Sequence, residues 1–166
     1  MNHPVINFYL EKCNGAYNYS LQDMWNIPQI ILGDGYFYIP WLFPVMESSK
    51  WNTNVPVFTE QEAQYFSQNA EIQQKYLHSV DFLLDYFCLY REGDQIYAKP
   101  ELIARNYWLR NIGHESKKIS RLIRSLNICG QKTLAKNLQQ FALKMGAEKG
   151  VIQPETIGIW QSLIED

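Results

Sequence analysis

The sequence predicts an all-α protein: a compact, irregular helical domain of about six or seven helices with an aromatic, proline-rich segment in its core. Two observations support this prediction. Apolar residues recur three and four positions apart through long stretches, which is typical of helices with one buried face. In addition, residues 35–44 contain five aromatic side chains and two prolines, too much apolar surface for water and too much proline for one long helix.

The aromatic segment is expected to form one short helical turn. Pro40 suits the first turn of a helix, whereas Pro44 disfavours a helical conformation in the residue before it. Residues 41–43 should therefore project in different directions. Two interpretations stay open: a buried plug between helices, or an aromatic-walled ligand pocket in which Tyr36 and Tyr38 supply polar groups.

Residues 1–33 are expected to be irregular and to pack on the rest of the chain. A short helix should begin after Ser20, because Ser20 and Asp23 have the spacing of a capping pair. Residues 5–8 have the composition of a short strand, although the sequence contains no evident partner for it.

Further helices are expected along the rest of the chain. Thr59 and Glu62 form the pattern of a capping box, with Phe58 as its hydrophobic staple, before a helix to about residue 66. The clearest periodic stretch covers residues 69–89, and residues 91–94 should end it. The remaining helices are expected at residues 100–110, 114–127, 131–149 and from Pro154 onward, with Gly130 and Gly150 as terminators.

Length and composition favour a single intracellular domain. With 166 residues, the chain is expected to form one domain over residues 1–166. No apolar run approaches the ~20 residues of a membrane span and the N-terminus lacks a secretory pattern, so a cytoplasmic location is expected. Three widely spaced cysteines predict neither a disulfide framework nor a zinc site, and no cofactor is expected.

Charge is distributed unevenly along the sequence. Residues 1–98 hold four Lys/Arg and eleven Asp/Glu, whereas residues 99–149 hold eleven and three. This favours either an anionic partner for the basic part or docking between acidic and basic parts, within one chain or across a homodimer. Nucleic-acid binding through residues 99–149 is kept only as an alternative, because the pI is about 5.9 and residues 114–127 lack interleaved aromatic side chains.

The sequence contains no catalytic motif that would assign an enzyme class. Patterns for a nucleophile elbow, a P-loop, a zinc protease and a dinucleotide-binding turn are all missing. His78, Asp81 and Asp85 share one helical stripe with the spacing of an acid–base or metal site. Because this stripe lies opposite the apolar face of its helix, it is expected to be a solvated surface and no metal site is predicted.

The basic helix carries the candidate anion site. Lys117, Arg121 and Arg124 lie on one helical face with Lys118 beside them, which suits a phosphate or a carboxylate. Solvation of the helix and pairing with acidic residues form the alternative interpretation. His114, which opens this helix, should cap it or contact a ligand.

Three motifs follow one another along the chain. They are Tyr38-Ile39-x-Trp41-Leu42-Phe43-Pro44; Phe58-Thr59-x-x-Glu62 with Ser67 and Glu71-Ile72-Gln73; and His114, Ile119, Arg121 and Ser125-Leu126. Over about residues 7–146 this order resembles the opioid growth factor receptor conserved-region family, here in a compact form without the vertebrate C-terminal repeats. Gly35-Tyr36-Phe37 and Pro40 depart from the Asn-His-Ser and Gln that are usual in the family.

The resemblance implies a helical domain that binds rather than catalyses. Vertebrate members are receptors for an enkephalin-type growth peptide, with signalling receptor activity associated with the nucleus and growth control. The first hypothesis is therefore a non-enzymatic binding or interaction domain, with a small-molecule sensor or enzyme for a phosphorylated or carboxylated ligand as the alternative. The expected contact residues are Tyr38, Trp41, Phe43, His114, Arg121 and Arg124, with Lys117 and Lys118 as anion-binding residues.

Overall fold

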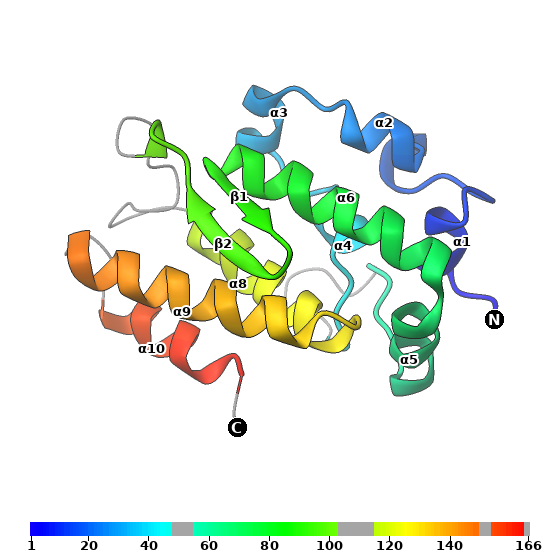
Figure 1. Ribbon diagram of the computed structural model, residues 1–166. Coiled ribbons are helices and arrows are strands. Elements are labelled where there is room, and N and C mark those ends of the chain that lie inside the picture. Colours follow the sequence, from blue (N-terminus) through cyan, green and yellow to red (C-terminus); the bar gives the residue numbers. More distant parts are fainter. Residues whose placement is uncertain (48–54, 103–114, 150–153, 165–166) are drawn as a thin grey trace. The chain divides into compact units, whose positions relative to one another are not determined.

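The computed structural model describes residues 1–47, 55–102, 115–149 and 154–164, which are mostly helical (Figure 1). The chain forms two compact units. Unit 1 contains Met1–Phe82 and Ile128–Gly130, and unit 2 contains Leu83–Asn127 and Gln131–Asp166. That the two units act as one domain stays a prediction.

Short helices open unit 1. α1 (Pro4–Tyr9) begins at His3, whose ring Nδ1 accepts a hydrogen bond from the Val5 amide at 3.0 Å. The strand expected at residues 5–8 is therefore wrong, because the His3 cap and the following proline start a helix there. The next elements are η1 (Ala16–Asn18), α2 (Leu21–Trp25), α3 (Gln29–Asp34) and α4 (Ile39–Leu42).

The capped helix and the proline-bounded turn are both confirmed. The Asp23 amide donates to Ser20 Oγ at 3.0 Å, and the Ser20 amide donates to Asp23 Oδ2 at 2.9 Å, so the capping box of α2 is complete. α4 is a single turn with Pro40 near its start and Phe43 at its end, directly before Pro44. Local sequence signals were sufficient for both elements.

Two longer helices follow. α5 (Glu60–Gln68) begins with the expected capping box between Thr59 and Glu62 and ends at Gln68 rather than at residue 66. α6 (Ala70–Tyr86) is shorter than expected, because Cys88 adopts a left-handed backbone conformation (φ 60°) and a strand begins at Leu89.

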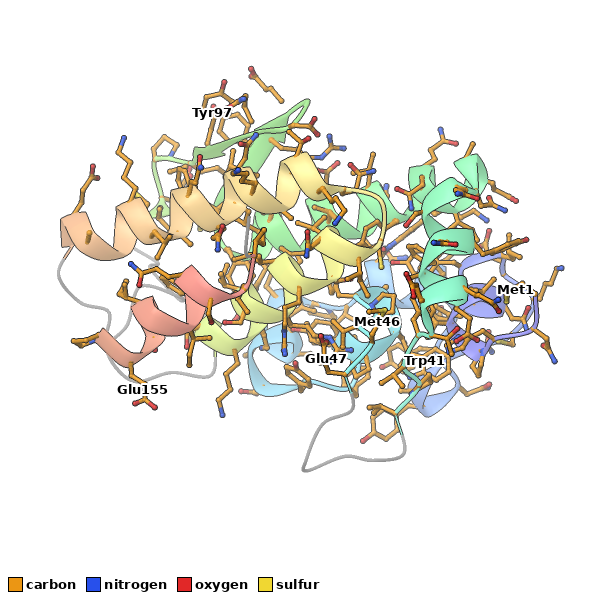
Figure 2. The ribbon with its side chains drawn as sticks, turned by 90° about the horizontal axis from the view of Figure 1, so that it is seen from below. Met1, Trp41, Met46, Glu47, Tyr97 and Glu155 are labelled. Carbon is orange, nitrogen blue, oxygen red and sulfur yellow. The ribbon has the colours of Figure 1, made fainter. Side chains whose placement is uncertain are left out.

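Unit 2 contains a β-hairpin where the sequence pattern predicted only the end of a helix. β1 (Leu89–Glu92) pairs antiparallel with β2 (Gln95–Ala98), and Gly93 in the two-residue turn has φ 60°. Tyr90 and Tyr97 stack across it with ring centroids 5.3 Å apart, and Figure 2 shows Tyr97 at its outer surface. With this one small sheet among otherwise helical described segments, the all-α fold class is confirmed.

Three helices complete unit 2. They are α8 (Glu115–Ile128), α9 (Lys132–Lys149) and α10 (Pro154–Ser162), and their bounds agree closely with expectation. Within the unit, α9 lies against both β2 and α10 (Figure 1). The helix expected at residues 100–110 falls largely outside the described residues. Gly130 has φ 93°, which confirms it as the residue that ends α8.

Aromatic rings form the core of unit 1. Phe66 lies among Tyr9, Tyr76 and Phe58, with centroid distances of 5.1, 5.1 and 5.4 Å, and the two tyrosine contacts are nearly perpendicular. Such edge-to-face pairs contribute about 0.5–1.5 kcal/mol beyond the area they bury. In unit 2, α8 and α9 instead bury the aliphatic residues Ile119, Leu122, Ile123, Leu126, Leu134 and Leu138.

A buried chain of hydrogen bonds connects four helices of unit 1. Trp25 Nε1 donates to Ser79 Oγ at 2.9 Å, and the Tyr9 hydroxyl lies 2.8 Å from Ser79 Oγ and 2.7 Å from the Leu42 carbonyl. Because a carbonyl only accepts and the Tyr9 hydroxyl has one hydrogen, Tyr9 donates to Leu42 and receives the Ser79 hydrogen. Ser79 of α6 is therefore hydrogen-bonded directly to Tyr9 of α1 and Trp25 of α2, and through Tyr9 it is connected to Leu42 of α4.

The segment 128–130 is anchored within unit 1. Ser67 Oγ donates to the Ile128 carbonyl at 3.2 Å, and Gln73 Nε2 donates to the Cys129 carbonyl at 2.8 Å. Gly130 packs so closely that a Cβ there would lie 3.0 Å from the backbone of Ser67. These contacts explain why a segment so late in the sequence belongs to the N-terminal unit.

Candidate ligand-binding cavity

The aromatic residues predicted to contact a ligand lie mostly inside unit 1. Tyr38 and Phe43 are fully buried, and the Tyr38 hydroxyl donates to the Leu32 carbonyl at 2.8 Å. Trp41 is half-buried and packs on Phe8 with ring centroids 5.4 Å apart. In this conformation Tyr38 and Phe43 are core residues, and Trp41 is the predicted contact that reaches the surface.

The predicted basic residues lie on α8 in unit 2. Lys117 is exposed and Arg124 is half-buried, whereas Lys118 and Arg121 are only 1% and 5% exposed. Lys118 Nζ lies 5.6 Å from the centre of the Tyr86 ring, within cation–π range. His114 lies outside the described residues. Because the aromatic and basic residues belong to different units, their shared site stays a prediction.

The acidic and histidine stripe of α6 behaves as a surface. His78, Asp81 and Asp85 are all exposed. The His78 ring packs against Trp25 with ring centroids 4.0 Å apart and planes tilted by 40°, and Asp85 forms an ion pair with Lys99. In the described segments, no three His, Cys, Asp or Glu side chains are grouped to hold a metal ion. Nor is any helix in these segments long and apolar enough to cross a membrane.

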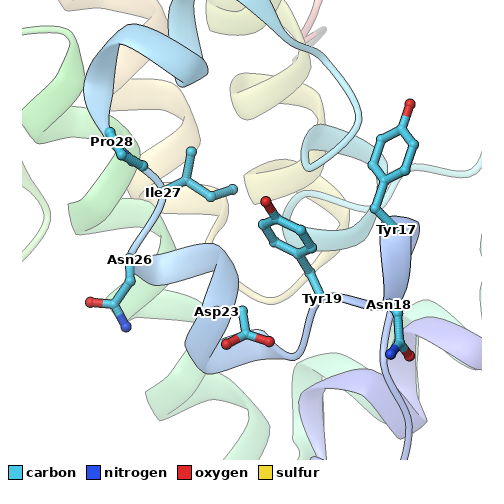
Figure 3. Close-up of a pocket in the computed structure, with 7 residues that line it drawn as sticks. All are labelled: Tyr17, Asn18, Tyr19, Asp23, Asn26, Ile27 and Pro28. Atoms are coloured by element: carbon cyan, nitrogen blue, oxygen red, sulfur yellow. The ribbon is translucent and has the colours of Figure 1, made fainter.

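A cavity of about 420 Å³ lies in unit 1, between η1 and the start of α3. Its lining residues are Tyr17, Asn18, Tyr19, Asp23, Asn26, Ile27 and Pro28 (Figure 3). This volume falls in the range of small-ligand pockets. The sequence pattern predicted an irregular stretch here and no ligand site.

The backbone around η1 shapes the cavity. Tyr17 and Asn18 have φ of 54° and 61°, a left-handed conformation that residues with a Cβ adopt uncommonly. The Asn14 side chain donates to Asn18 Oδ1 at 3.0 Å, and the Gly15 amide donates to the Tyr19 carbonyl at 2.7 Å. This tight loop places Tyr17 and Tyr19 beside residues of α2 in the lining of the cavity. Two successive left-handed residues leave no clear composition signal, which is why the cavity was missed.

Two tyrosine rings form the aromatic wall. Phe37 contacts both, with centroids 5.1 Å from Tyr17 and 5.5 Å from Tyr19 and interplanar angles of 75°. Tyr17 is 78% exposed and stands at the mouth, whereas Ile27 is buried. Figure 3 shows the Tyr19 and Ile27 side chains directed toward each other across the cavity. The buried Ile27 therefore forms the apolar base of the cavity, and the exposed Tyr17 ring borders its opening.

Polar groups of α2 complete the lining. Asp23 is held by its capping box, in which Oδ2 accepts from the Ser20 amide. Asn26 Nδ2 donates to the Gln22 carbonyl at 2.9 Å, so the Asn26 oxygen is the atom left to accept a bond from a ligand. The cavity thus offers aromatic rings together with hydrogen-bond donors and acceptors, which suits reversible binding.

Comparison with known proteins identifies the family. Residues 3–165 match the sequence model described as "Opioid growth factor receptor (OGFr) conserved region". The chain is similar to the opioid growth factor receptor of Homo sapiens (25% identity over 98% of this chain and 24% of that protein) and to that of Rattus norvegicus (23% over 96% and 28%). It thus spans about a quarter of the length of these relatives. No solved structure gives a significant match. Because the family match covers almost the whole chain, this protein belongs to the opioid growth factor receptor conserved-region family, as its ordered motifs predicted.

Proposed function

We propose that this chain is a non-enzymatic binding domain that holds a ligand in the cavity lined by residues 17–28 of unit 1. The cavity is the observation that supports this function, because its volume of about 420 Å³ falls in the range of small-ligand sites and its lining combines aromatic rings with a few polar groups. The curated relatives are named receptors, which is consistent with a role in binding and signalling.

Amide chemical shifts of the ¹⁵N-labelled full chain test the proposal. A library of small polar and aromatic fragments should contain members that shift the amides of residues 17–28. The same spectra test the predicted contacts at Trp41, Arg121 and Arg124, since a ligand bound there would shift those amides instead.

A pair of tyrosine variants makes the test specific. Tyr19→Leu removes a ring from the cavity and should abolish the shifts, whereas Tyr97→Leu removes a 40% exposed ring from the hairpin of unit 2 and should leave them unchanged. The proposal fails if no fragment shifts residues 17–28, or if the shifts survive in Tyr19→Leu while that variant keeps the wild-type fold.

A further inference from the structure

We propose that the cavity of unit 1 binds an alkylguanidinium group, carried either by a small molecule or by an arginine side chain of a partner. The inference rests on the proposed function, because it assigns the ligand class of the same site. Three features of the lining support it: its charge, its rings and its hydrogen-bond acceptors.

The lining carries negative charge alone. Asp23 is the charged residue among the described lining residues, which include no lysine, arginine or histidine. Unit 1 as a whole contains three Lys/Arg and eight Asp/Glu, a net charge of −5. Its field therefore favours the approach of a cation. A phosphorylated or carboxylated ligand would find no cationic partner in this lining.

The rings suit a planar cation. A guanidinium group is flat and stacks on aromatic faces, where it gains a cation–π interaction. Phe37 holds the Tyr17 and Tyr19 rings through near-perpendicular contacts. Because Tyr17 is largely exposed at the mouth, its ring has surface available for stacking by an entering group.

Two of the polar side chains in the lining carry acceptor oxygens that match N–H donors. Asp23 Oδ2 is occupied by the Ser20 amide, and among the described residues no hydrogen bond engages its Oδ1. The Asn26 oxygen is likewise the atom that remains once Nδ2 donates to Gln22. A guanidinium has only N–H donors, arranged in a rigid plane, so it can donate to a carboxylate oxygen such as Asp23 Oδ1. An ammonium lacks that plane and should bind less tightly.

Two probes of equal shape separate charge from fit. n-Butylguanidinium and n-butylurea are both planar, but only the first is charged. We expect butylguanidinium to shift the amides of residues 17–28 with a dissociation constant about three- to tenfold lower than that of butylurea. The difference is modest because cation–π and ion-pair contacts at an exposed site are weak. The difference should shrink as salt is added.

The outcomes separate this inference from the proposed function. Equal affinity for the two probes overturns the guanidinium assignment and leaves the cavity as a binding site. The assignment also fails alone if neither probe shifts these amides while other fragments do. If no fragment binds at residues 17–28, the proposed function fails as well.

One conservative variant locates the charge. Asp23→Asn keeps an oxygen for the Ser20 amide but removes the charge, and it should abolish the preference for guanidinium over urea. Glu62→Gln is the matched control, since Glu62 occupies the same capping-box position in α5 of unit 1 and does not line the cavity. Equal weakening by both variants would attribute binding to the general field of the unit and overturn the assigned site.

A peptide pair distinguishes the two sources of the group. Acetyl-Gly-Arg-Gly-amide is the probe, and its citrulline counterpart, in which an uncharged ureido group replaces the guanidinium, is its control. Tighter binding of the arginine peptide than of butylguanidinium supports a partner's arginine as the ligand. Tighter binding of butylguanidinium supports a small molecule.

Discussion

Unit 1 and unit 2 use different interactions to hold their helices together. In unit 1, short helices are connected by perpendicular aromatic rings and by the hydrogen-bond chain through Ser79. In unit 2, the longer helices α8 and α9 bury aliphatic stripes. Helices as short as α1 or α2 are not stable alone, so they depend on specific tertiary contacts. We therefore expect substitution of single side chains to lower the free energy of unfolding more in unit 1 than in unit 2.

The largest expected effect comes from the central ring of unit 1. Phe66→Ala removes a buried ring that contacts three others, and it should lower the free energy of unfolding by about 3–5 kcal/mol. Leu122→Ala in unit 2 should cost about 2–4 kcal/mol, because the lost side chain is smaller. Urea unfolding curves measure both. A larger loss for Leu122→Ala would break the comparison.

Two glycines with positive φ give the next largest difference. Alanine costs about 1–2 kcal/mol in a left-handed conformation wherever it occurs. At Gly93 of unit 2 (φ 60°) the added Cβ meets open space, so Gly93→Ala should show this strain alone. At Gly130 of unit 1 the Cβ would press on Ser67 and Gln73 at 3.0 Å, which should add roughly 1–3 kcal/mol. Thermal unfolding of the two variants tests this, and equal losses would mean that the contacts around Gly130 relax freely.

The hydroxyl of Ser79 should have a smaller but distinct effect. Ser79→Ala leaves the half-buried Trp25 and the buried Tyr9 without this partner and should cost about 1–3 kcal/mol. The control is Ser120→Ala in unit 2, where the hydroxyl donates to the Ser116 carbonyl one turn earlier, and a loss below about 1 kcal/mol is expected. Urea unfolding gives both values, and Trp25 fluorescence should report the local change. Similar losses at both serines would count against a special role for the chain through Ser79.

The smallest predicted effect appears at alkaline pH. Burial raises the pKa of Tyr9 above its value of about 10 in an unfolded chain. The neutral Tyr9 hydroxyl therefore makes its full contribution to the free energy of unfolding below pH ~10. Above that pH the free energy of unfolding falls by about 1.4 kcal/mol per pH unit. The chain should unfold more easily between pH 10 and 11, and Tyr9→Phe should show a shallower pH dependence despite its lower stability at pH 7. Parallel slopes in the two proteins would contradict this account.

Features that depend on local sequence could be predicted, whereas features that depend on tertiary contacts could not. The capping boxes at Ser20 and Thr59, the single turn at Pro40 and the end of α8 at Gly130 are local signals, and all of them were predicted. The hairpin could also have been found, because Gly93-Asp94 separates two segments of alternating polarity.

The features missed in unit 1 depend on long-range contacts or unusual backbone conformations. The cap of α1 by His3 replaced an expected strand, and this ring also bonds to the Val57 carbonyl, far away in the sequence. The cavity depends on left-handed conformations at Tyr17 and Asn18; asparagine favours this conformation, but tyrosine gives no such signal. Tertiary contacts select such conformations, so they cannot be predicted from residue spacing and composition.

The assignment of residues 128–130 to unit 1 has a consequence for biosynthesis. A ribosome makes the chain from its N-terminus, so residues 1–82 emerge long before the segment that completes their contacts with Ser67 and Gln73. Unit 1 therefore cannot finish folding until most of unit 2 has also been synthesised. No single cleavage of the chain releases unit 1 whole, and a shortened N-terminal fragment would lack the contacts that residues 128–130 make with Ser67 near the end of α5 and Gln73 near the start of α6.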